Sequence, residues 1–297
     1  MPRLKEIISD KTVTAWVITS SALVLIIPFL LVSALVIKSL PFLSEQNLLQ
    51  LLSGNEFRPL SGIFGFAPFI TGSLYVTLLS MAFVIPVCLL SSVYLTFFEG
   101  RRFLPLVQPA LDILAGIPSV VYGIWGVIAI VPAVRGMAES MGISSTGYSL
   151  LAGSIVLAVI VIPFTMNMMT EILKTVPPEL NEVTLSLGAT QWIAVKRVVL
   201  RKAMPGLISS IFLGLARAFG ETMAVLMVAG CVVQVPHSLF DGAFPLPALI
   251  ALNYSEMLSI PHYDSALMFA ALLLLIIVLL FNTSARIMIR YWEKQTG

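Results

Sequence analysis

The chain has 297 residues, of which 58% are hydrophobic and only 11% are charged, with a formal net charge of +2. Soluble globular domains carry about 25% charged residues, so this composition excludes a soluble globular protein. The small net charge gives no indication of nucleic-acid binding.

Six apolar stretches are long enough to cross a bilayer, because a helix of roughly 20 apolar residues spans the hydrocarbon core. The first follows three basic residues but is longer than the roughly 7–15 residues of a signal-peptide core, so we expect a retained helix. The chain is therefore predicted to be all-α and polytopic, with six transmembrane helices. These lie at about 14–38, 72–97, 106–133, 147–170, 205–231 and 265–289.

Lysines and arginines are concentrated on one side of the predicted spans. Thirteen of the 17 lie in the N-terminal segment, the 98–105 and 171–204 connections and the C-terminal segment, and three lie on the opposite side. The remaining one is Arg217, inside the fifth predicted span. Because positive residues favour the cytoplasmic side, we expect both termini in the cytoplasm.

Three connections are long. The two on the predicted outer side, at 39–71 and 232–264, are rich in proline, glycine and aromatic residues. This composition suits short interfacial helices or re-entrant structure, and simple connection accounts equally for part of each.

The long inner connection at 171–204 is predicted to hold two helices. The first can begin at Pro178 and repeats apolar residues at helical spacing up to Gly188, which ends it. Thr190 can cap a second helix that carries Trp192 and several basic residues. We expect either helices that lie on the lipid surface or a protruding knob that docks into a partner's groove.

Two charged residues, Arg217 and Glu221, interrupt the fifth predicted span. Placed in one helix four residues apart, they share a face and can pair, and the small residues Ser210 and Gly214 belong to that face. A charge at the centre of a spanning helix costs about 2.5–3.5 kcal/mol, and a buried ion pair rarely stabilises more than two apolar residues do. We therefore expect a role in an anion path, with a clamp between helices as the structural alternative.

The pair suits phosphate chemically. Arginine offers a permanent charge and a fork of donors for tetrahedral oxyanions. Phosphate near neutral pH still carries a proton that the Glu221 carboxylate can accept, whereas fully deprotonated sulfate is repelled.

Asp112 is the other acidic residue in an apolar run, and we expect it to be hydrated near the cytoplasmic end of its helix. A role in gating, or in pairing with a basic residue, is the alternative. Cys88 and Cys231 are interpreted as small hydrophobic residues. His237 and His262 show no metal-binding spacing, so no metal site is expected.

The inner connection resembles the EAA loop of ABC importer permeases. That pattern reads Glu-Ala-Ala, three residues, Gly, nine residues, Ile-x-Leu-Pro. Glu182, Gly188, Val198 and Leu200 stand at the matching positions, whereas valine and threonine replace the alanines and Arg201 replaces the proline.

Further segments, in order along the chain, resemble phosphate ABC-transporter permeases. FGFAPFITGS after Arg58-Pro59 favours the PstC-type subunit over the PstA-type. The segments are FGFAPFITGSLYVT (64–77), LAGIPSVVYGIWG (114–126), SLGATQWIAV (186–195), ARAFGETMAVLMVAG (216–230) and LLFNTSARIMIR (279–290).

The resemblance implies a type I ABC importer permease fold. Residues 1–71 would form an N-terminal helix and outer loop, and 72–291 the permease domain, with a coupling loop at about 177–203. The substrate pathway would include Arg217, Glu221, Ser210 and Gly214. Contacts with the ATPase are implied for Glu182, Gly188, Ala189, Thr190 and Trp192.

The resemblance also implies partners: a PstA-type permease subunit in a heterodimer, two copies of an ATP-binding subunit, and a phosphate-binding protein on the outer face. The complex would lie in a bacterial or archaeal plasma (inner) membrane. The sequence has no G-x-x-x-x-G-K-[ST] segment, the loop that cradles ATP phosphates. We therefore expect no enzymatic site and no cofactor in this chain, with ATP and Mg²⁺ used by the ATPase subunit.

The predicted function is ATP-driven import of inorganic phosphate by alternating access. Import of another oxyanion, such as molybdate, tungstate or sulfate, is the alternative because the loop pattern is common to these permeases. A proton-coupled secondary transporter that uses Glu221 and Asp112 is less favoured, since no inverted repeat is evident.

Overall fold

The computed structural model describes residues 2–98, 103–254 and 263–296. Within these ranges, six helical stretches are long and apolar enough to cross a membrane, which confirms the predicted all-α chain with six spans. They cover Thr12–Glu45, Ala67–Phe97, Ser119–Ser140, Leu150–Lys174, Gln191–Gly220 and Tyr263–Trp292.

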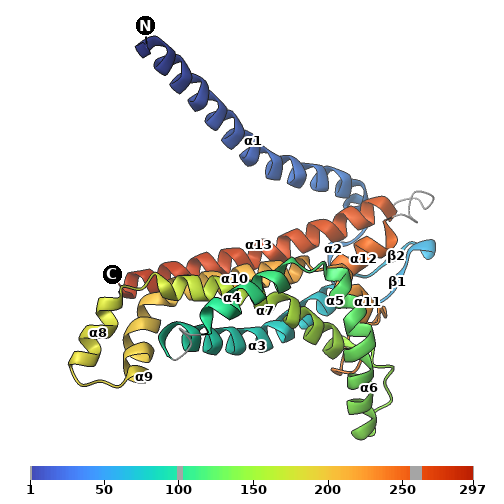
Figure 1. The fold of residues 1–297 in the computed structure, drawn as a ribbon. Coiled ribbons are helices and arrows are strands. Elements are labelled where there is room, and N and C mark those ends of the chain that lie inside the picture. Colours follow the sequence, from blue (N-terminus) through green and yellow to red (C-terminus); the bar gives the residue numbers. More distant parts are fainter. Residues whose placement is uncertain (1, 99–102, 255–262, 297) are drawn as a thin grey trace.

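Helix α1 (Pro2–Glu45) projects away from the rest of the molecule (Figure 1). Residues 12–31 are all exposed, whereas Phe42 near the end of the helix is buried. The projecting part presents apolar side chains on all sides, as expected of a helix surrounded by lipid.

An aromatic cluster fixes the buried end of α1. It includes β2 (Ile63–Phe64), which pairs antiparallel with β1 (Phe57–Arg58). The Phe42 ring centroid lies 5.0 Å from that of Phe64 and 5.8 Å from that of Phe269. Two short helices contribute to the cluster, α2 (Leu48–Ser53) and α12 (Leu246–Asn253), and η1 (Pro59–Ser61) lies between the two strands.

The bundle is built around α7 (Leu150–Lys174), which is the most buried of the six spans. The Ser149 hydroxyl caps its first turn by accepting from the Ala152 N–H. Two long helices, α3 (Ala67–Phe97) and α10 (Leu200–Gly220), pack against it, and α13 (Tyr263–Thr296) packs against α10 and α1.

The third span differs from the prediction of one helix over 106–133. α4 (Leu104–Gly116) ends before Pro118, and α5 (Ser119–Trp125) then continues through a π-helical turn, η3 (Gly126–Ile130), into α6 (Val131–Ser140). Proline lacks an N–H and disfavours helical geometry in the preceding residue. Ile117 accordingly has ψ 130°.

The fifth span also differs from its predicted range of 205–231. It begins at α9 (Gln191–Ala194), passes through a second π-helical turn, η4 (Val195–Val199), and ends with α10 at Gly220. Glu221 has extended backbone angles, φ −72° and ψ 122°, and the short helix α11 (Met223–Val228) follows. The second helix predicted in the inner connection is therefore the start of this span.

Candidate permeation path and coupling loop

Arg217 lies in the last turn of α10 and is exposed on the surface of the chain. Its guanidinium carbon lies 5.0 Å from the ring centroid of Phe164 on α7, which is a cation–π contact. The Tyr122 phenol on α5 is close enough to interact electrostatically with Arg217. The ion pairs found within the described ranges do not include Arg217, so its charge is left un-neutralised there.

The predicted pairing of Arg217 with Glu221 is wrong. The two residues do not share a helix, because α10 ends at Gly220. The Glu221 carboxylate instead accepts from the Ala224 N–H at 3.3 Å, at the start of α11, where an anionic side chain is favourable. The break in the backbone thus separates the two charges that the sequence places four residues apart.

Ser210 and Gly214 lie in the contact between α10 and α7. Ser210 is fully buried and donates to the Leu207 carbonyl at 2.8 Å. A Cβ atom on Gly214 would lie 2.5 Å from the Thr165 hydroxyl oxygen, so the glycine lets α10 and α7 approach closely with this Thr165 rotamer. A role for Ser210 and Gly214 in the substrate pathway stays a prediction.

A row of polar contacts joins α4 to an exposed side of α7. The Asn167 amide donates to one Asp112 carboxylate oxygen at 2.8 Å. The Gln108 amide donates to Glu171 at 3.1 Å, and the Lys174 ammonium donates to the same Glu171 oxygen at 2.8 Å.

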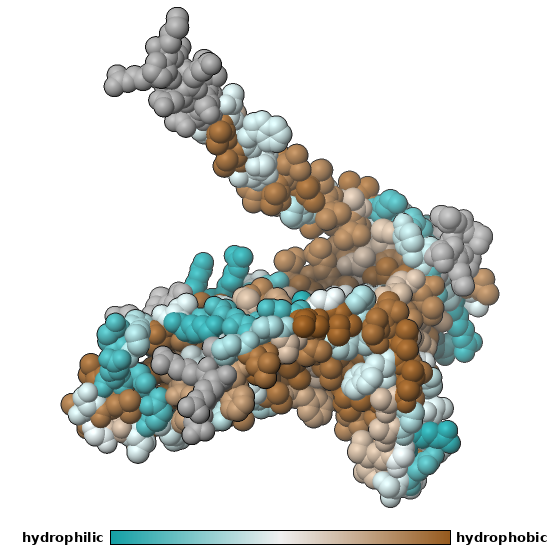
Figure 2. All heavy atoms as spheres, in the orientation of Figure 1, coloured by the Kyte–Doolittle hydropathy of each residue, from teal (hydrophilic) through white to brown (hydrophobic). Residues whose placement is uncertain are grey.

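These contacts and Arg217 form one continuous feature, because Phe164, Asn167 and Glu171 are three and seven residues apart and share a helix face. We call it the polar stripe. Figure 2 shows a hydrophilic band across an otherwise largely hydrophobic face, over the region of α4, α7 and α10. The stripe consists of Arg217, Asn167, Asp112, Gln108, Glu171 and Lys174.

The middle of the stripe lies inside the membrane-spanning segments, whereas Glu171 and Lys174 lie at the end of α7. Asn167 is seven residues from the end of α7, or about 10 Å along the helix, so Asp112 beside it lies deeper than the hydrated end position expected for it. No basic partner of Asp112 is found within the described ranges, which do not include Arg101 and Arg102. Polar groups at this depth face water or another protein chain rather than lipid.

The stripe was only partly visible in the sequence. Arg217 and Asp112 stand out as charges inside apolar runs, whereas Asn167, Glu171 and Lys174 sit near a connection and read as its polar margin. The helical spacing of Asn167, Glu171 and Lys174 predicts that they share a face of α7. The sequence does not predict that this face meets α4, because one sequence does not say which helices are neighbours.

The inner connection has the predicted helix–glycine–helix form, with α8 (Pro178–Ser186) protruding at one end of the bundle (Figure 1). Gly188 has φ 83°, a conformation that glycine adopts without strain. The Thr190 hydroxyl accepts from the Ile193 N–H at 3.4 Å. The Gln191 side chain donates to the Phe97 carbonyl at 3.0 Å and ties this loop to the end of α3.

Large apolar side chains are exposed on this protruding loop. Leu187 is 84% exposed, Val183 60% and Trp192 49%, and Glu182 is exposed beside them. We call these four residues the coupling patch. Exposed apolar patches rimmed by polar residues mark interaction sites. Because α8 protrudes from the end of the bundle (Figure 1), this patch favours the docking knob over helices that lie on the lipid surface.

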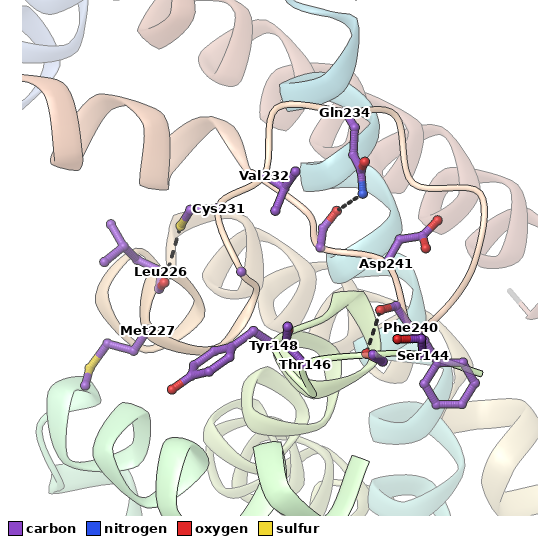
Figure 3. A pocket seen from close by; sticks show the side chains of 13 residues that line it. Ser144, Thr146, Tyr148, Leu226, Met227, Cys231, Val232, Gln234, Phe240 and Asp241 are labelled. Atoms are coloured by element: carbon purple, nitrogen blue, oxygen red, sulfur yellow. Dashed lines mark hydrogen bonds between the residues drawn. The ribbon is translucent and has the colours of Figure 1, made fainter. Parts of the chain in front are cut away.

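A cavity of about 640 Å³ lies at the other end of the bundle, between residues 144–148 and the segment 226–242 (Figure 3). At the edge of this cavity, the Asp241 carboxylate stabilises a turn by accepting hydrogen bonds from the backbone N–H groups of His237 and Ser238. The described residues that line the cavity include hydroxyl groups but neither lysine nor arginine. The charge that suits an anion is therefore on the polar stripe instead.

Comparison with known proteins decides the family. A family model described as binding-protein-dependent transport system inner membrane component matches residues 85–296. The chain belongs to this family. With its six apolar spans, it is a multi-pass protein of the inner membrane.

Two relatives illustrate the match. The chain is 35% identical over 232 residues to the probable ABC transporter permease protein YqgH of Bacillus subtilis (strain 168), covering 78% of this chain and 72% of that protein. It is 33% identical over 257 residues to the phosphate transport system permease protein PstC of Xylella fastidiosa (strain Temecula1), covering 82% and 79%. The resemblance to PstC-type permeases is confirmed.

Solved structures confirm the type I importer permease fold. A chain of the MetNI methionine ABC transporter, in an inward-facing conformation, matches with a TM-score of 0.60 at 21% identity, covering 80% of this chain and 99% of that chain. A chain of a bacterial ABC transporter involved in the import of the acidic polysaccharide alginate matches with a TM-score of 0.57 at 18% identity, covering 91% and 95%. At these identities the likeness concerns the fold alone.

Proposed function

We propose that this permease subunit of an ABC importer conducts inorganic phosphate, and that the anion passes along the polar stripe. The observation that carries the proposal is Arg217, a permanent cation at membrane depth that no described carboxylate neutralises. A guanidinium offers several donors in one plane to a tetrahedral oxyanion. The similarity to PstC proteins supports phosphate as that oxyanion.

The proposal includes the partners. The exposed stripe needs a protein-enclosed, water-filled path, which a second permease subunit of PstA type would complete as a heterodimer. A phosphate-binding protein would deliver the anion to the end that holds the 640 Å³ cavity. Both termini would face the cytoplasm, the side that the excess of lysine and arginine favours.

The ATPase would act through the coupling patch. Two copies of an ATP-binding subunit would use ATP and Mg²⁺, and this chain would contribute no catalytic group or cofactor. An apolar, protruding surface suits docking into a groove of such a partner. Glu182, Ala189 and Thr190 would support this contact, with Gly188 shaping the turn.

Glu221 has a different role in this proposal from the one that the sequence favours. Through its contact with the Ala224 N–H it orders the chain after Gly220, and this leaves Arg217 at a free helix end. Ser210 and Gly214 would hold α10 close to α7 beside the path.

Uptake by the complete transporter in proteoliposomes tests the proposal. We expect ATP-dependent uptake of phosphate, and a decrease of about 10- to 100-fold in Arg217→Gln, since a hydrogen bond to a charged group contributes about 1.5–3 kcal/mol. Arg135→Gln is the matched control, because Arg135 is exposed and pairs with Glu139 far from the stripe.

Two results would contradict the proposal. Uptake of sulfate or molybdate in place of phosphate would refute the substrate. Unchanged phosphate uptake in Arg217→Gln, with assembly and ATP hydrolysis intact, would remove Arg217 from the path.

A further inference from the structure

The carboxylate of Asp112 is the negative group nearest to Arg217 along the polar stripe. Asn167, which binds Asp112, is three residues from Phe164, on which Arg217 stacks. Three residues of helix correspond to about 4.5 Å along α7. An anion that leaves Arg217 toward the coupling patch therefore meets Asp112 next.

Asp112 and Glu171 on the stripe differ in whether a cation offsets their negative charge. Glu171 is offset by Lys174, whose ammonium lies 2.8 Å from its carboxylate. Asp112 receives only the neutral Asn167 amide on one oxygen, and its second oxygen has no hydrogen-bond donor within the described ranges. The other charged and titratable groups on and beside the stripe are Glu171 and Lys174 on α7, Arg217 on α10, and Tyr122 on α5, which interacts with Arg217.

A carboxylate without a cationic partner in an anion path distinguishes oxyanions that carry a proton from oxyanions that do not. A proton-bearing oxyanion can donate a hydrogen bond to it, and a charge-assisted bond of this kind is short and strong. A fully deprotonated oxyanion such as sulfate presents only acceptors to it and is repelled. The repulsion also doubles between monobasic and dibasic phosphate, because it scales with the charge.

We propose that Asp112 is a specificity-determining residue that passes proton-bearing oxyanions and favours monobasic over dibasic phosphate. This inference rests on the proposed phosphate path. Asn167 is the positioning residue: it holds one oxygen of Asp112 and leaves the other for the anion.

The test compares Asp112→Asn with the wild-type transporter in proteoliposomes that contain all subunits. The substituted amide keeps an oxygen for Asn167 and removes the charge. Phosphate uptake at saturating binding protein is measured at a series of pH values through the second ionisation of phosphate. The ratio of variant to wild-type uptake at each pH cancels the pH dependence of the other subunits.

We expect this ratio to rise with pH by about threefold to tenfold, the effect of one unit charge at this separation in a partly hydrated path. Asp112→Glu, which keeps the carboxylate, is expected to follow the wild-type profile. Glu139→Gln is the matched control, because it removes an exposed carboxylate that pairs with Arg135 away from the stripe.

A constant ratio would overturn the inference, whether uptake by Asp112→Asn is normal or uniformly reduced, since a structural role scales all pH values alike. A wild-type transporter that takes up no phosphate would instead refute the proposed function itself. The two failures are therefore distinguishable.

Discussion

Phe164 holds Arg217 in place without neutralising it. A carboxylate partner would compete with an arriving anion, whereas an aromatic face contributes only about 0.5–2 kcal/mol and leaves the guanidinium donors at its edge available. The contact at 5.0 Å thus positions the cation and preserves its charge.

Replacing Phe164 by leucine is expected to lower phosphate uptake about fivefold, the equivalent of a cation–π contact of about 1 kcal/mol. Phe164→Tyr keeps the aromatic face and is expected to retain wild-type uptake. Phe281→Leu is the control for lost aromatic packing, because Phe281 contacts Phe219 and not Arg217. Equal losses in Phe164→Leu and Phe281→Leu would mean that packing alone matters.

At the same scale, the sequence predicts charges better than their partners. Arg217 is conspicuous because it interrupts an apolar run. That interruption and the resemblance to phosphate permeases predict that it lines an anion path, which stays a prediction. The partner of Arg217 was predicted wrongly. Four-residue spacing pairs Arg217 with Glu221 only in an unbroken helix, and α10 ends between them.

The elements show why the spans were predicted better than their breaks. Hydropathy reports composition, and apolar residues continue through both Pro118 and Gly220, so hydropathy alone predicts one helix in each region. Gly116, Pro118 and Gly123 indicate a bend in the first region, whereas no such signal marks the break after Gly220. The backbone ends a helix where hydrogen bonds fail or a side chain substitutes for them, as at Ile117 before Pro118 and at Glu221 before α11.

The turn between α8 and α9 offers a test at this scale. Gly188→Ala places a side chain in a left-handed conformation, which costs about 1–2 kcal/mol, although the space around Gly188 is open. We expect fewer phosphate ions transported per ATP hydrolysed, because the coupling patch is displaced. Gly188→Asn, which tolerates this conformation better, is expected to restore part of the loss.

Gly142 provides the matched control for that test. It has φ 72° and equally open surroundings, but it lies near the cavity at the opposite end of the bundle. Gly142→Ala carries the same conformational cost and is expected to leave the transport-to-hydrolysis ratio unchanged. A similar decrease in both variants would show that strain anywhere in the chain impairs coupling.

On the scale of the whole molecule, the aromatic cluster is the attachment of α1. Phe42 is 1% exposed, whereas Phe29 on the projecting part is 75% exposed. The composition predicts that α1 spans the membrane, but it does not predict this one-sided anchorage, because the rings that meet Phe42 come from residues as distant as Phe269.

Phe42→Ala is expected to destabilise the folded chain by about 3–5 kcal/mol, the usual cost of emptying a buried phenylalanine site. Thermal unfolding of the detergent-solubilised protein, followed by circular dichroism, measures it. Phe29→Ala is the control and is expected to have little effect. Equal melting temperatures for the two variants would contradict the anchoring role of the cluster.

The continuous helical span from Gln191 to Gly220 can transmit a rotation at its α9 end to Arg217 near its other end. Arg217 lies 26 residues from Gln191 on that span, a length of about 39 Å. A tilt of about 5° around the α9 end would move the guanidinium by about 3 Å, roughly the length of one hydrogen bond. In the proposed transporter, a small rotation at the α9 end, beside the coupling patch, would therefore be enough to break one hydrogen bond between Arg217 and an anion.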